Sequence, residues 1–212
     1  RQVYLIEEPV AAAIGIGLDI SKPVGSIIID IGGGTTEIAV IALNGVVTKE
    51  AIRVAGDEMD EAIINHCREN YRLLIGERTA EMVKIKIGSA TVVDQETTMD
   101  VKGRDLVDGL PKTIEVSSKE IREAMAEPLA AILSSIKEAL ERCPPELAAD
   151  LVDRGIMLAG GGALLGGLDV WLTEQTGVPT HLSGDPLIAV VEGTGRVLSE
   201  VSYIKKMTSA GV

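Results

Sequence analysis

The chain has 212 residues, of which 46% are apolar and 2% aromatic, with no Phe. This length suffices to bury a substantial core, in one domain or in two small lobes, and that core must consist of Ile, Val, Leu, Ala and Met. The formal net charge of −12 repels a phosphate backbone, and the scarcity of aromatic rings removes any stacking platform, so no nucleic acid is expected as a partner.

The first predicted elements are a short strand at residues 3–6 and a helix in the run VAAAIGIGLDI, joined by Glu8 and Pro9. Pro9 suits the first helical position, because its missing N–H would have no partner there. Glu8 stands at the edge where open α/β sheets bind ligands, although an isolated Glu at a helix start commonly serves the helix dipole. Because the chain enters this strand from Arg1 rather than from Met, we interpret it as a piece of a longer protein.

Two strongly apolar runs, Ser26–Ile31 and Ile38–Leu43, are rich in Ile and Val and predict buried strands. We expect a third strand at residues 46–54, which completes an antiparallel meander. The dipeptide Asn44-Gly45 predicts a type I′ turn between the second and third strands, because both residues tolerate positive φ angles.

The turn between the first two of these strands contains three consecutive glycines and two threonines, and Asp30 lies just before it. A hairpin alone does not need three glycines. Main chain without Cβ atoms lets a ligand approach, successive N–H groups bind anions, and Asp30 could hold a hydrated divalent cation that faces those anions. Gly32, Gly33 and Gly34 therefore indicate either a phosphate-binding hairpin or a bulged, Gly-rich β-turn.

Two helices are predicted next, in the runs MDEAIINHCRENYRLLIG and ERTAEMVKIKIG. The first has one apolar face at helical spacing, formed by Met59, Ile63, Ile64, Cys67 and Tyr71. The second places Glu81 and Lys84 one turn apart, a spacing typical of a weak surface salt bridge. From about residue 90 to residue 115 the sequence is polar with short β-like pieces, which predicts an exposed small lobe.

Ser117 and Glu120 match a capping box that opens a long helix. Pro128 lies inside this helix and should bend it, because proline removes a backbone hydrogen bond and its ring clashes with the preceding turn. The pair Pro144-Pro145 should end the helix.

A buried strand at residues 155–159 is followed by a second triple glycine, at residues 160–162, and by a helix in the run ALLGGLDVWLTEQTG. Bare main chain at a strand end admits a flat or charged group, and a helix start offers N–H donors. Tight packing of the helix against the strand would equally require small residues. A last helix is predicted from Pro186 to about Lys205.

Isolated reactive residues suggest no further site. Cys67 and Cys143 lack the close spacing of a metal or redox pair, so both are expected to be ordinary buried or half-buried thiols in a reducing cytosol rather than a disulfide. His66 and His181 likewise have no ligand-spaced neighbours. No apolar run approaches the roughly 20 residues that cross a bilayer, we expect no signal peptide, and the pair Lys205-Lys206 is too small for a membrane-surface patch.

Several of these segments resemble the actin, heat-shock chaperone and sugar-kinase superfamily. The run DIGGGTTE at residues 30–37 resembles its second phosphate motif, and GIMLAGGGALLGGL at residues 155–168 resembles its adenosine motif. Four further segments resemble MreB, the family of bacterial actins that governs rod shape: IEEPVAAAIG, VAGDEMDEAI, IGERTAEMVKIKIG and CPPELAADLVDRGI. Together these segments span most of the chain.

The resemblance implies an α/β fold, namely the C-terminal half of an actin-like ATPase of the ribonuclease H-like type. A mixed sheet flanked by helices would form subdomain IIA from residues 1–54 and 118–212. A small inserted α+β subdomain, IIB, would comprise residues 55–117. The first phosphate loop of the family, and its membrane-contacting segment, would lie outside this sequence.

The resemblance also implies a catalytic centre and a metal site. Glu8 would position or deprotonate the water that attacks ATP. Asp30 would face a Mg ion through water, and Glu37 would assist nearby.

The same resemblance implies the residues around the nucleotide. The β- and γ-phosphates would be held by Gly32, Gly33, Gly34 and Thr35. Glu81 and Lys84 would reach the ribose and the adenine, and the base and sugar would be supported by Gly160, Gly161 and Gly162. Family members commonly have a basic residue where this chain has Gly166, a departure that concerns the purine side and not the phosphate side.

The implied function is that of a cytoskeletal ATPase that polymerises head to tail into filaments and determines rod shape. The filaments would lie in the cytoplasm at the inner face of the cell membrane, with membrane proteins of cell-wall elongation as partners and membrane contact through residues outside this chain. We expect ATP hydrolysis from the full-length protein and not from this chain alone. The alternatives are a small-molecule kinase or chaperone-type ATPase lobe of the same superfamily, or a docking module without activity of its own.

Overall fold

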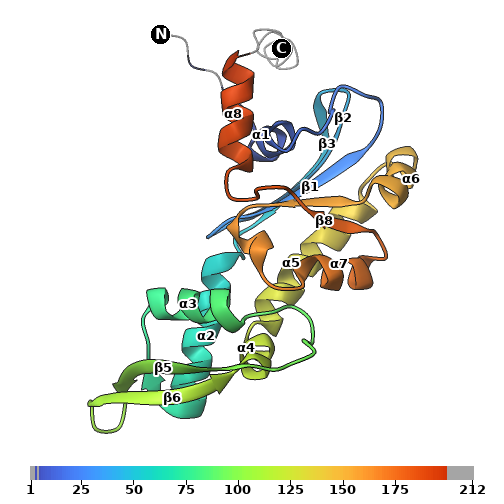
Figure 1. The fold of residues 1–212 in the computed structure, drawn as a ribbon. Helices are drawn as coiled ribbons and strands as arrows, with labels where there is room; N and C mark the ends of the chain where they lie inside the picture. The colour runs from blue at the N-terminus through green and yellow to red at the C-terminus, as the bar shows by residue number, and fades with distance from the viewer. Residues whose placement is uncertain (1–2, 4, 200–212) are drawn as a thin grey trace.

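A computed structural model describes residue 3 and residues 5–199 of the chain. These residues form a larger lobe and a smaller lobe that extends away from it (Figure 1). The expected strand at residues 3–6 falls partly outside the described residues, and its described members form no strand. The expected end of the last helix near Lys205 and the pair Lys205-Lys206 lie outside them.

A five-stranded sheet forms the centre of the larger lobe. Its strands follow the order β3-β2-β1-β7-β8, with the bounds β1 Ser26–Ile31, β2 Thr36–Ala42, β3 Gly45–Ile52, β7 Ile156–Ala159 and β8 Thr180–Leu182. The first three strands are antiparallel neighbours, whereas β7 runs parallel to β1 and β8 runs parallel to β7. The expected α/β fold with a mixed sheet is confirmed.

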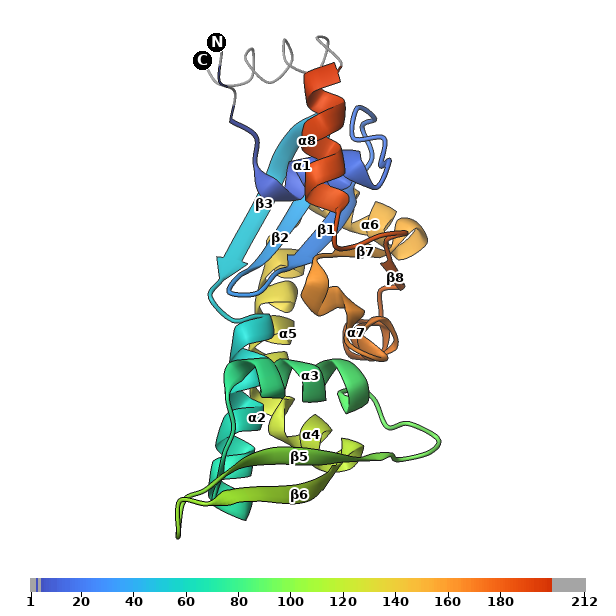
Figure 2. The same cartoon turned by 60° about the vertical axis from the view of Figure 1, so that its left-hand side comes forward.

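Helices cover both faces of this sheet (Figure 2). One face packs against α1 (Glu8–Gly15) and α8 (Ala189–Ser199), and the other packs against α5 (Ala126–Glu141), α6 (Pro145–Arg154) and α7 (Leu168–Thr176). Side chains alternate between the two faces along a strand. In β1, Ile27 and Ile29 therefore join the core beneath α5, whereas Ile28 joins the core beneath α1.

Helices α1 and α8 cross at two glycines that allow close backbone contact. A Cβ atom on Gly15 would lie 1.8 Å from the carbonyl oxygen of Ala189, and one on Gly193 would lie 1.8 Å from the carbonyl oxygen of Ala11. Arg196 Nη1 also donates to the carbonyl of Ile14 over 2.8 Å. These contacts fix α1, and with it Glu8, against α8.

The smaller lobe contains a three-stranded sheet and two helices, and a third helix, α4 (Ser118–Ala124), packs against both of them. The sheet order is β4-β5-β6, with the bounds β4 Leu73–Leu74, β5 Thr98–Asp105 and β6 Pro111–Ser117, and the helices are α2 (Gly56–Tyr71) and α3 (Glu77–Ile87). The polar run at residues 90–115 supplies the β5–β6 hairpin. The division into subdomains at residues 54 and 117 stays a prediction.

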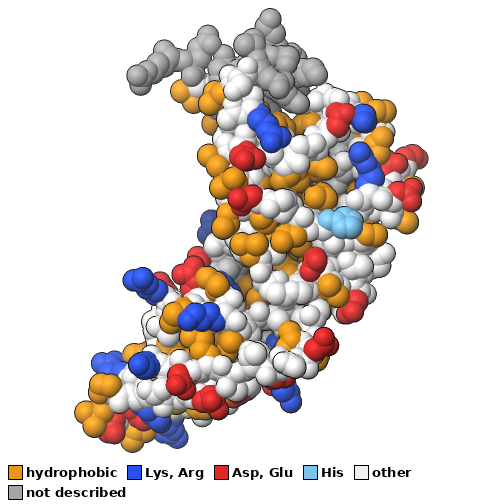
Figure 3. All heavy atoms as spheres, in the orientation of Figure 1, with side chains coloured by type: hydrophobic (Ala, Val, Ile, Leu, Met, Phe, Trp, Pro, Cys, Tyr) orange, Lys and Arg blue, Asp and Glu red, His pale blue; other side chains and the backbone are white. Residues whose placement is uncertain are grey.

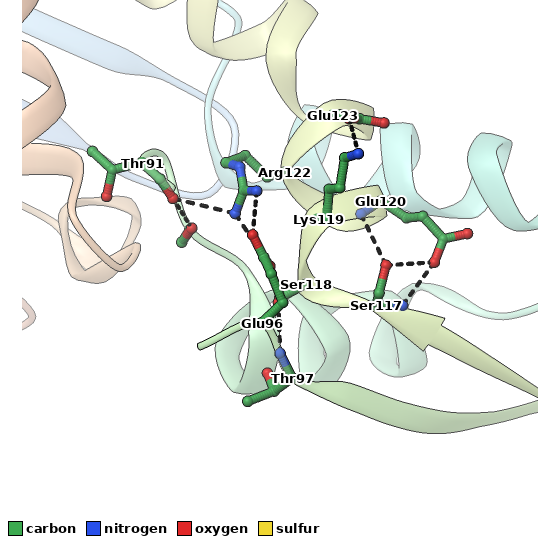
Figure 4. A network of polar contacts seen from close by, with 10 residues as sticks. Thr91, Glu96, Thr97, Ser117, Ser118, Lys119, Glu120, Arg122 and Glu123 are labelled. Carbon is green, nitrogen blue, oxygen red and sulfur yellow. Dashed lines mark hydrogen bonds and ion pairs between the residues drawn. The ribbon is translucent and has the colours of Figure 1, made fainter. Parts of the chain in front are cut away.

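Polar contacts anchor the segment before β5 to α4 (Ser118–Ala124) (Figure 4). Ser117 Oγ accepts from the backbone N–H of Glu120, and the Glu120 carboxylate accepts from the backbone N–H of Ser117 over 2.8 Å, which confirms the capping box. Arg122 donates to the Glu96 carboxylate and to the carbonyl of Thr91. The segment between α3 and β5 is thereby tied to the helix that leads back to the larger lobe.

The long helix predicted after Ser117 is split rather than bent. α4 ends at Ala124 and α5 begins at Ala126, with Met125 between them. Pro128 then lies within the first turn of α5, where its missing N–H leaves no helical bond unmade. The proline thus begins a new helix instead of kinking a continuous one.

Other local predictions were wrong in register or extent. The hairpin between β2 and β3 turns at Leu43 and Asn44, with φ angles of 51° and 63°, and not at Asn44-Gly45. A bulge between Val40 and Ile41 shifts the pairing, so that Ala42 faces Gly45.

Two helix boundaries also differ from the prediction, and one helix was missed. The helix expected to reach Gly76 ends at Tyr71, because Arg72 adopts a left-handed conformation with φ 52° and the next two residues pair as β4. α6, which begins directly at Pro145, was missed because the two prolines were interpreted only as a stop. The helix expected from Ala163 begins at Leu168, after a short 3-10 turn, η1 (Gly161–Leu164).

Both cysteines are buried and free, as expected. Among the described residues, no helix has the length and apolar character needed to span a bilayer.

Candidate functional site

The β1–β2 turn exposes main chain at three consecutive glycines. The backbone conformation of the turn does not require glycine at these positions. None of Gly32, Gly33 and Gly34 has a positive φ angle. A Cβ atom on Gly32 would approach the protein no closer than 3.4 Å, and one on Gly34 no closer than 3.6 Å. A bulged turn would demand glycine through a positive φ angle, and tight packing would demand it through a close contact at the Cβ position. Neither explanation accounts for the three glycines.

The N-terminus of α2 holds this turn in place. The backbone N–H of Gly56 donates to the carbonyl of Gly32 over 3.2 Å, and that of Asp57 donates to the carbonyl of Gly33 over 2.8 Å. The Asp57 carboxylate would lie 3.3 Å from a Cβ atom on Gly33. Thr36 Oγ1 also donates to the carbonyl of Val54, directly before the helix.

The second triple glycine is explained in part by packing. A Cβ atom on Gly160 would lie 2.3 Å from the carbonyl oxygen of Ile31 and 2.4 Å from Asp30 Oδ1, and one on Gly162 would lie 2.4 Å from Ile31 Cγ2. A Cβ atom on Gly161 would meet only the side chain of Leu187, at 3.2 Å. Packing of η1 on the end of β1 therefore requires glycine at positions 160 and 162. This packing does not require glycine at position 161.

The two glycine segments share one cavity of about 560 Å³. It is lined by Gly32, Gly33, Gly56, Asp57, Met59, Asp60, Glu81, Lys84, Ile85, Gly161, Gly162, Leu164, Leu165, Gly166 and Leu187. It lies between the lobes, bounded by the β1–β2 turn, α2, α3 and the segment around η1. Figure 3 shows the molecule narrowing on the left between its two lobes. The volume lies within the usual range for small-molecule sites.

A buried ion pair joins α3 to α2 inside this cavity. Lys84 Nζ donates to Asp60 Oδ2 over 2.9 Å and to the carbonyl of Gly56 over 2.8 Å. Lys84 therefore pairs with Asp60. The salt bridge between Lys84 and Glu81, which the spacing of these residues had suggested, does not form. Burial raises the pKa of Asp60, while the bond to Lys84 opposes this shift. The pair links α3 to the same helix N-terminus that holds the glycine turn.

Three carboxylates lie near one another at the end of β1. Asp30 and Glu37 face each other across the β1–β2 pair, and Glu8 begins α1 on the same side of the sheet. Burial, together with the negative charges of Glu8 and Glu37, raises the pKa of Asp30 to about 6. Asp30 Oδ2 and Glu37 Oε2 are buried without a hydrogen-bond partner. Lys49 lies 3.5 Å from Glu37 Oε2 and pairs more closely with Glu7, at 3.0 Å.

These carboxylates fit a hydrated cation better than a directly bound one. Among the described residues, no three His, Cys, Asp or Glu side chains are placed to ligate a metal together. A divalent cation could still sit near Asp30 and Glu37 if water and an anion completed its oxygen shell, the arrangement usual for Mg²⁺. Such a cation would also offset the burial and the neighbouring negative charges that raise the pKa of Asp30.

The structure brings six of the predicted site residues together in the cavity: Gly32, Gly33, Glu81, Lys84, Gly161 and Gly162. Gly34 and Thr35 are exposed in the same turn without lining the cavity. Gly160 contacts Asp30, which connects the second glycine segment to the carboxylates.

Sequence reasoning missed Asp57, Asp60 and the apolar residues of the cavity. The run VAGDEMDEAI contained Asp57 and Asp60, and a helix N-terminus beside a glycine turn was a signal that could have identified them. No signal in the sequence identified Ile85, Leu164 or Leu187, because isolated apolar residues on surface helices are common.

A family model described as MreB/Mbl protein matches residues 1–206 of this chain. The cell shape-determining protein MreB of Escherichia coli K12 is 53% identical over 201 residues, which are 95% of this chain and 58% of that protein. The cell shape-determining protein Mbl of Bacillus subtilis is 48% identical over 206 residues, which are 97% of this chain and 62% of that protein. The chain thus spans less than two thirds of the length of these curated relatives.

Solved structures are similar over the same region. MreB5 of Spiroplasma citri bound to ADP has a TM-score of 0.93 and 39% identity, covering 97% of this chain and 63% of that one. The same protein bound to AMPPNP has a TM-score of 0.92 and 40% identity, covering 100% of this chain and 63% of that one. The MamK double helical filament has a TM-score of 0.76 and 25% identity, covering 92% of this chain and 59% of that one.

Proposed function

The chain belongs to the MreB/Mbl family, and on this premise we propose that it forms the C-terminal, nucleotide-binding part of an actin-like cytoskeletal ATPase. The complete protein polymerises into filaments and determines rod shape. Its similarity to proteins named for cell shape, and to a filament-forming protein, supports this function.

The observation that carries the proposal is the shared cavity between the two glycine segments. Gly33 offers exposed main chain that neither backbone conformation nor packing accounts for, and bare turns of this kind bind anions. Gly161, from the other segment, faces the same space. A nucleoside polyphosphate has an anionic end for the first segment and an apolar base for the second. The crystal structures of MreB5 with ADP and AMPPNP accord with such a ligand.

Within this proposal the phosphates bind to the turn formed by Gly32, Gly33, Gly34 and Thr35. Glu81 and Lys84 line the same cavity and reach the ribose and the adenine, although Lys84 already gives two of its three N–H donors to Asp60 and Gly56. Gly161 and Gly162 support the base. Gly160 acts indirectly, by allowing η1 to reach β1.

Asp30 and Glu37 are the residues that would hold a Mg²⁺ cofactor through water beside the phosphates. The ion neutralises phosphate charge when it is bound. Glu8 begins a helix that packing fixes in place, and its charge acts on Asp30. We assign to Glu8 the orientation of the attacking water and acceptance of its proton.

The chain alone hydrolyses no detectable ATP in this account. A site built between two lobes loses about half of its donors with one lobe, and each charge-assisted hydrogen bond contributes roughly 1.5–3 kcal/mol. The full-length protein supplies the remaining donors. Filaments at the inner face of the cell membrane, with membrane proteins of cell-wall elongation as partners, belong to that full-length protein as well.

A kinase or chaperone lobe of the same superfamily is the rival function, and the curated relatives do not favour it. Sedimentation and electron microscopy of the full-length protein with ATP and Mg²⁺ test the two. The proposed function predicts pelleted filaments that depend on nucleotide. Monomers that phosphorylate a small molecule, or that show no response to nucleotide, would contradict it.

A further inference from the structure

We propose that Arg122 is a positioning residue for the nucleotide cavity and that it acts by holding a strap between the two lobes. The strap consists of residues 88–97, which join α3 to β5. Its first residues contact the larger lobe, and its last residues contact α4. This inference rests on the proposed nucleotide binding and assigns a part in that binding to a side chain that does not line the cavity.

The strap begins with a pairing between the lobes at the edge of the cavity. Ser89 forms a bridge with Gly166, and the backbone N–H of Ala90 donates to the carbonyl of Gly166 over 2.8 Å. Gly166 and its neighbour Leu165 line the cavity from the larger lobe, and α3 lines it from the smaller lobe. Because α3 leads directly into the strap, this pairing sets the separation between the two sides.

Thr91 is the strap residue that connects this pairing to Arg122. A Cβ atom on Gly167 would lie 2.3 Å from Thr91 Oγ1, so the Thr91 side chain packs directly on bare main chain of the larger lobe. The Thr91 carbonyl accepts from Ser89 Oγ and from Arg122 Nη1, the latter over 3.3 Å. A carbonyl oxygen has two lone pairs and can accept both bonds.

The far end of the strap is held by the same guanidinium. Arg122 Nη2 donates to Glu96 Oε1 over 2.5 Å, and Ser118 Oγ donates to the Glu96 carboxylate. The backbone N–H of Ser118 also donates to the carbonyl of Thr97 over 2.8 Å. Figure 4 shows Arg122 between the Glu96 carboxylate and the Thr91 carbonyl. Several donors in one rigid plane suit Arg to join two acceptors in this way.

Burial distinguishes this ion pair from an ordinary one on the same helix. The Arg122 side chain is 15% exposed and that of Glu96 is 35% exposed. Lys119 and Glu123 lie 3.9 Å apart, and both of their side chains are 65% exposed. Exposed pairs contribute little because water and salt screen them. We therefore expect the loss of Arg122 to release the strap and the loss of Lys119 to leave it in place.

Release of the strap has a specific consequence for the nucleotide. The pairing with Gly166 opposes separation of the lobes, so its loss should shorten the time for which a nucleotide stays bound. The carboxylates at the end of β1 have no contact with the strap, so the rate at which bound ATP is hydrolysed should not depend on Arg122. A general loss of stability would affect both quantities.

The test measures the release of fluorescent etheno-ADP from the full-length protein with Mg²⁺ after addition of excess ADP. Arg122→Met should raise the dissociation rate about tenfold, the size of one charge-assisted hydrogen bond. Lys119→Met, the matched control on α4, should change it less than about twofold. Glu96→Ala should have a smaller effect than Arg122→Met, because Arg122 still donates to the Thr91 carbonyl. Single-turnover hydrolysis of bound ATP should stay within about twofold of the unmodified rate in all three variants.

A second readout follows the strap itself. Hydrogen–deuterium exchange at the Ala90 N–H should be faster in Arg122→Met than in Lys119→Met, while exchange along β1 stays the same. Equal rates of etheno-ADP release in these two variants would overturn the positioning role of Arg122 and leave nucleotide binding intact. Faster release without faster exchange at Ala90 would overturn the strap as its cause. Absence of etheno-ADP binding to the unmodified protein would overturn the proposed function, and the role of Arg122 with it.

Discussion

Gly33 and Gly161, which belong to distant parts of the sequence, line the same cavity between the two lobes. Neither has a positive φ angle, and a Cβ atom on either would meet only a side chain, Asp57 for Gly33 and Leu187 for Gly161. The protein itself therefore does not require glycine at these two positions. A ligand that approaches the main chain would require it.

Glycine substitutions should separate ligand binding from folding. We expect Gly33→Ala to change the free energy of unfolding by less than about 1 kcal/mol and to weaken nucleotide binding. Gly160→Ala should instead destabilise the protein by about 3 kcal/mol or more, because its φ angle is 84° and its Cβ atom would lie 2.3 Å from the Ile31 carbonyl. Urea denaturation of both variants measures the difference. Equal stabilities would contradict the packing role of Gly160.

The ion pair between Lys84 and Asp60 should be costly to break from one side. Both side chains are largely buried, at 14% and 11% exposure. Lys84→Met leaves the Asp60 carboxylate buried without its partner, so we expect a loss of about 3 kcal/mol or more. The double variant Lys84→Met/Asp60→Asn should recover much of this loss. A double variant as unstable as Lys84→Met alone would show that the charge of Asp60 is not the cause.

Asp30 should make stability depend on pH. Its pKa is about 6 in the folded protein, against an ordinary value of 3.8, so the native state binds the proton more tightly than the unfolded chain. The free energy of unfolding should therefore fall as the pH rises from about 4 to about 6, and this contribution should be constant above that window. Asp30→Asn should remove this part of the pH dependence, measured by urea denaturation across the window.

The Asp30 carboxyl should also couple the binding of nucleotide with Mg²⁺ to the release of a proton. A cation near Asp30 favours the ionised carboxylate and lowers its pKa. Near pH 6, binding should release a fraction of a proton, and the amount should diminish by pH 8. Calorimetry in buffers of different ionisation enthalpy measures the release. An Asp30→Asn variant that releases the same number of protons would assign the effect to another group.

Glu8 should matter for hydrolysis and not for binding. In the full-length protein, Glu8→Ala should slow ATP hydrolysis about 10²- to 10⁴-fold, the usual contribution of a positioned acid or base. Glu7→Ala is the matched control, since Glu7 pairs with Lys49 at 3.0 Å and has no assigned part in the reaction. Phosphate-release kinetics distinguish the two variants. Similar rates in both would remove Glu8 from the reaction.

The β2–β3 hairpin offers a stabilising substitution. Leu43 has a φ angle of 51° and is 64% exposed, so it bears the steric cost of a left-handed conformation with little burial in return. Leu43→Gly should raise the free energy of unfolding by about 0.5–1 kcal/mol. Leu110→Gly, at a similarly exposed residue without a positive φ angle, should not. A loss of stability in Leu43→Gly would contradict this explanation.

The sequence predicted the elements whose signals are local. The Ile-rich strands and the capping box at Ser117 and Glu120 are of this kind, and both were found. The hairpin turn was placed one residue late because the bulge at Val40 and Ile41, which sets the register, has no sequence signature. Pro145 was interpreted as an end of helix because a proline suits an N-terminus and an ending equally well.

The parts of the candidate site that belong to sequence motifs were predicted. The parts that arise only from the packing of distant segments were missed. The two glycine segments are visible in the sequence, but their convergence depends on the parallel pairing of β1 with β7. The contacts at a Cβ atom on Gly160 show that this glycine serves packing, whereas the sequence did not distinguish it from Gly161 and Gly162. The partner of Lys84 was missed because Asp60 lies on another helix.

The central claim is that one nucleotide contacts both glycine segments. Its most direct test is the ADP affinity of the full-length protein with Mg²⁺, measured by calorimetry for the unmodified protein and for Gly33→Val and Gly161→Val. The account predicts binding to the unmodified protein and at least a tenfold loss in each variant, with the fold retained by circular dichroism. Unchanged ADP affinity in either variant would contradict it.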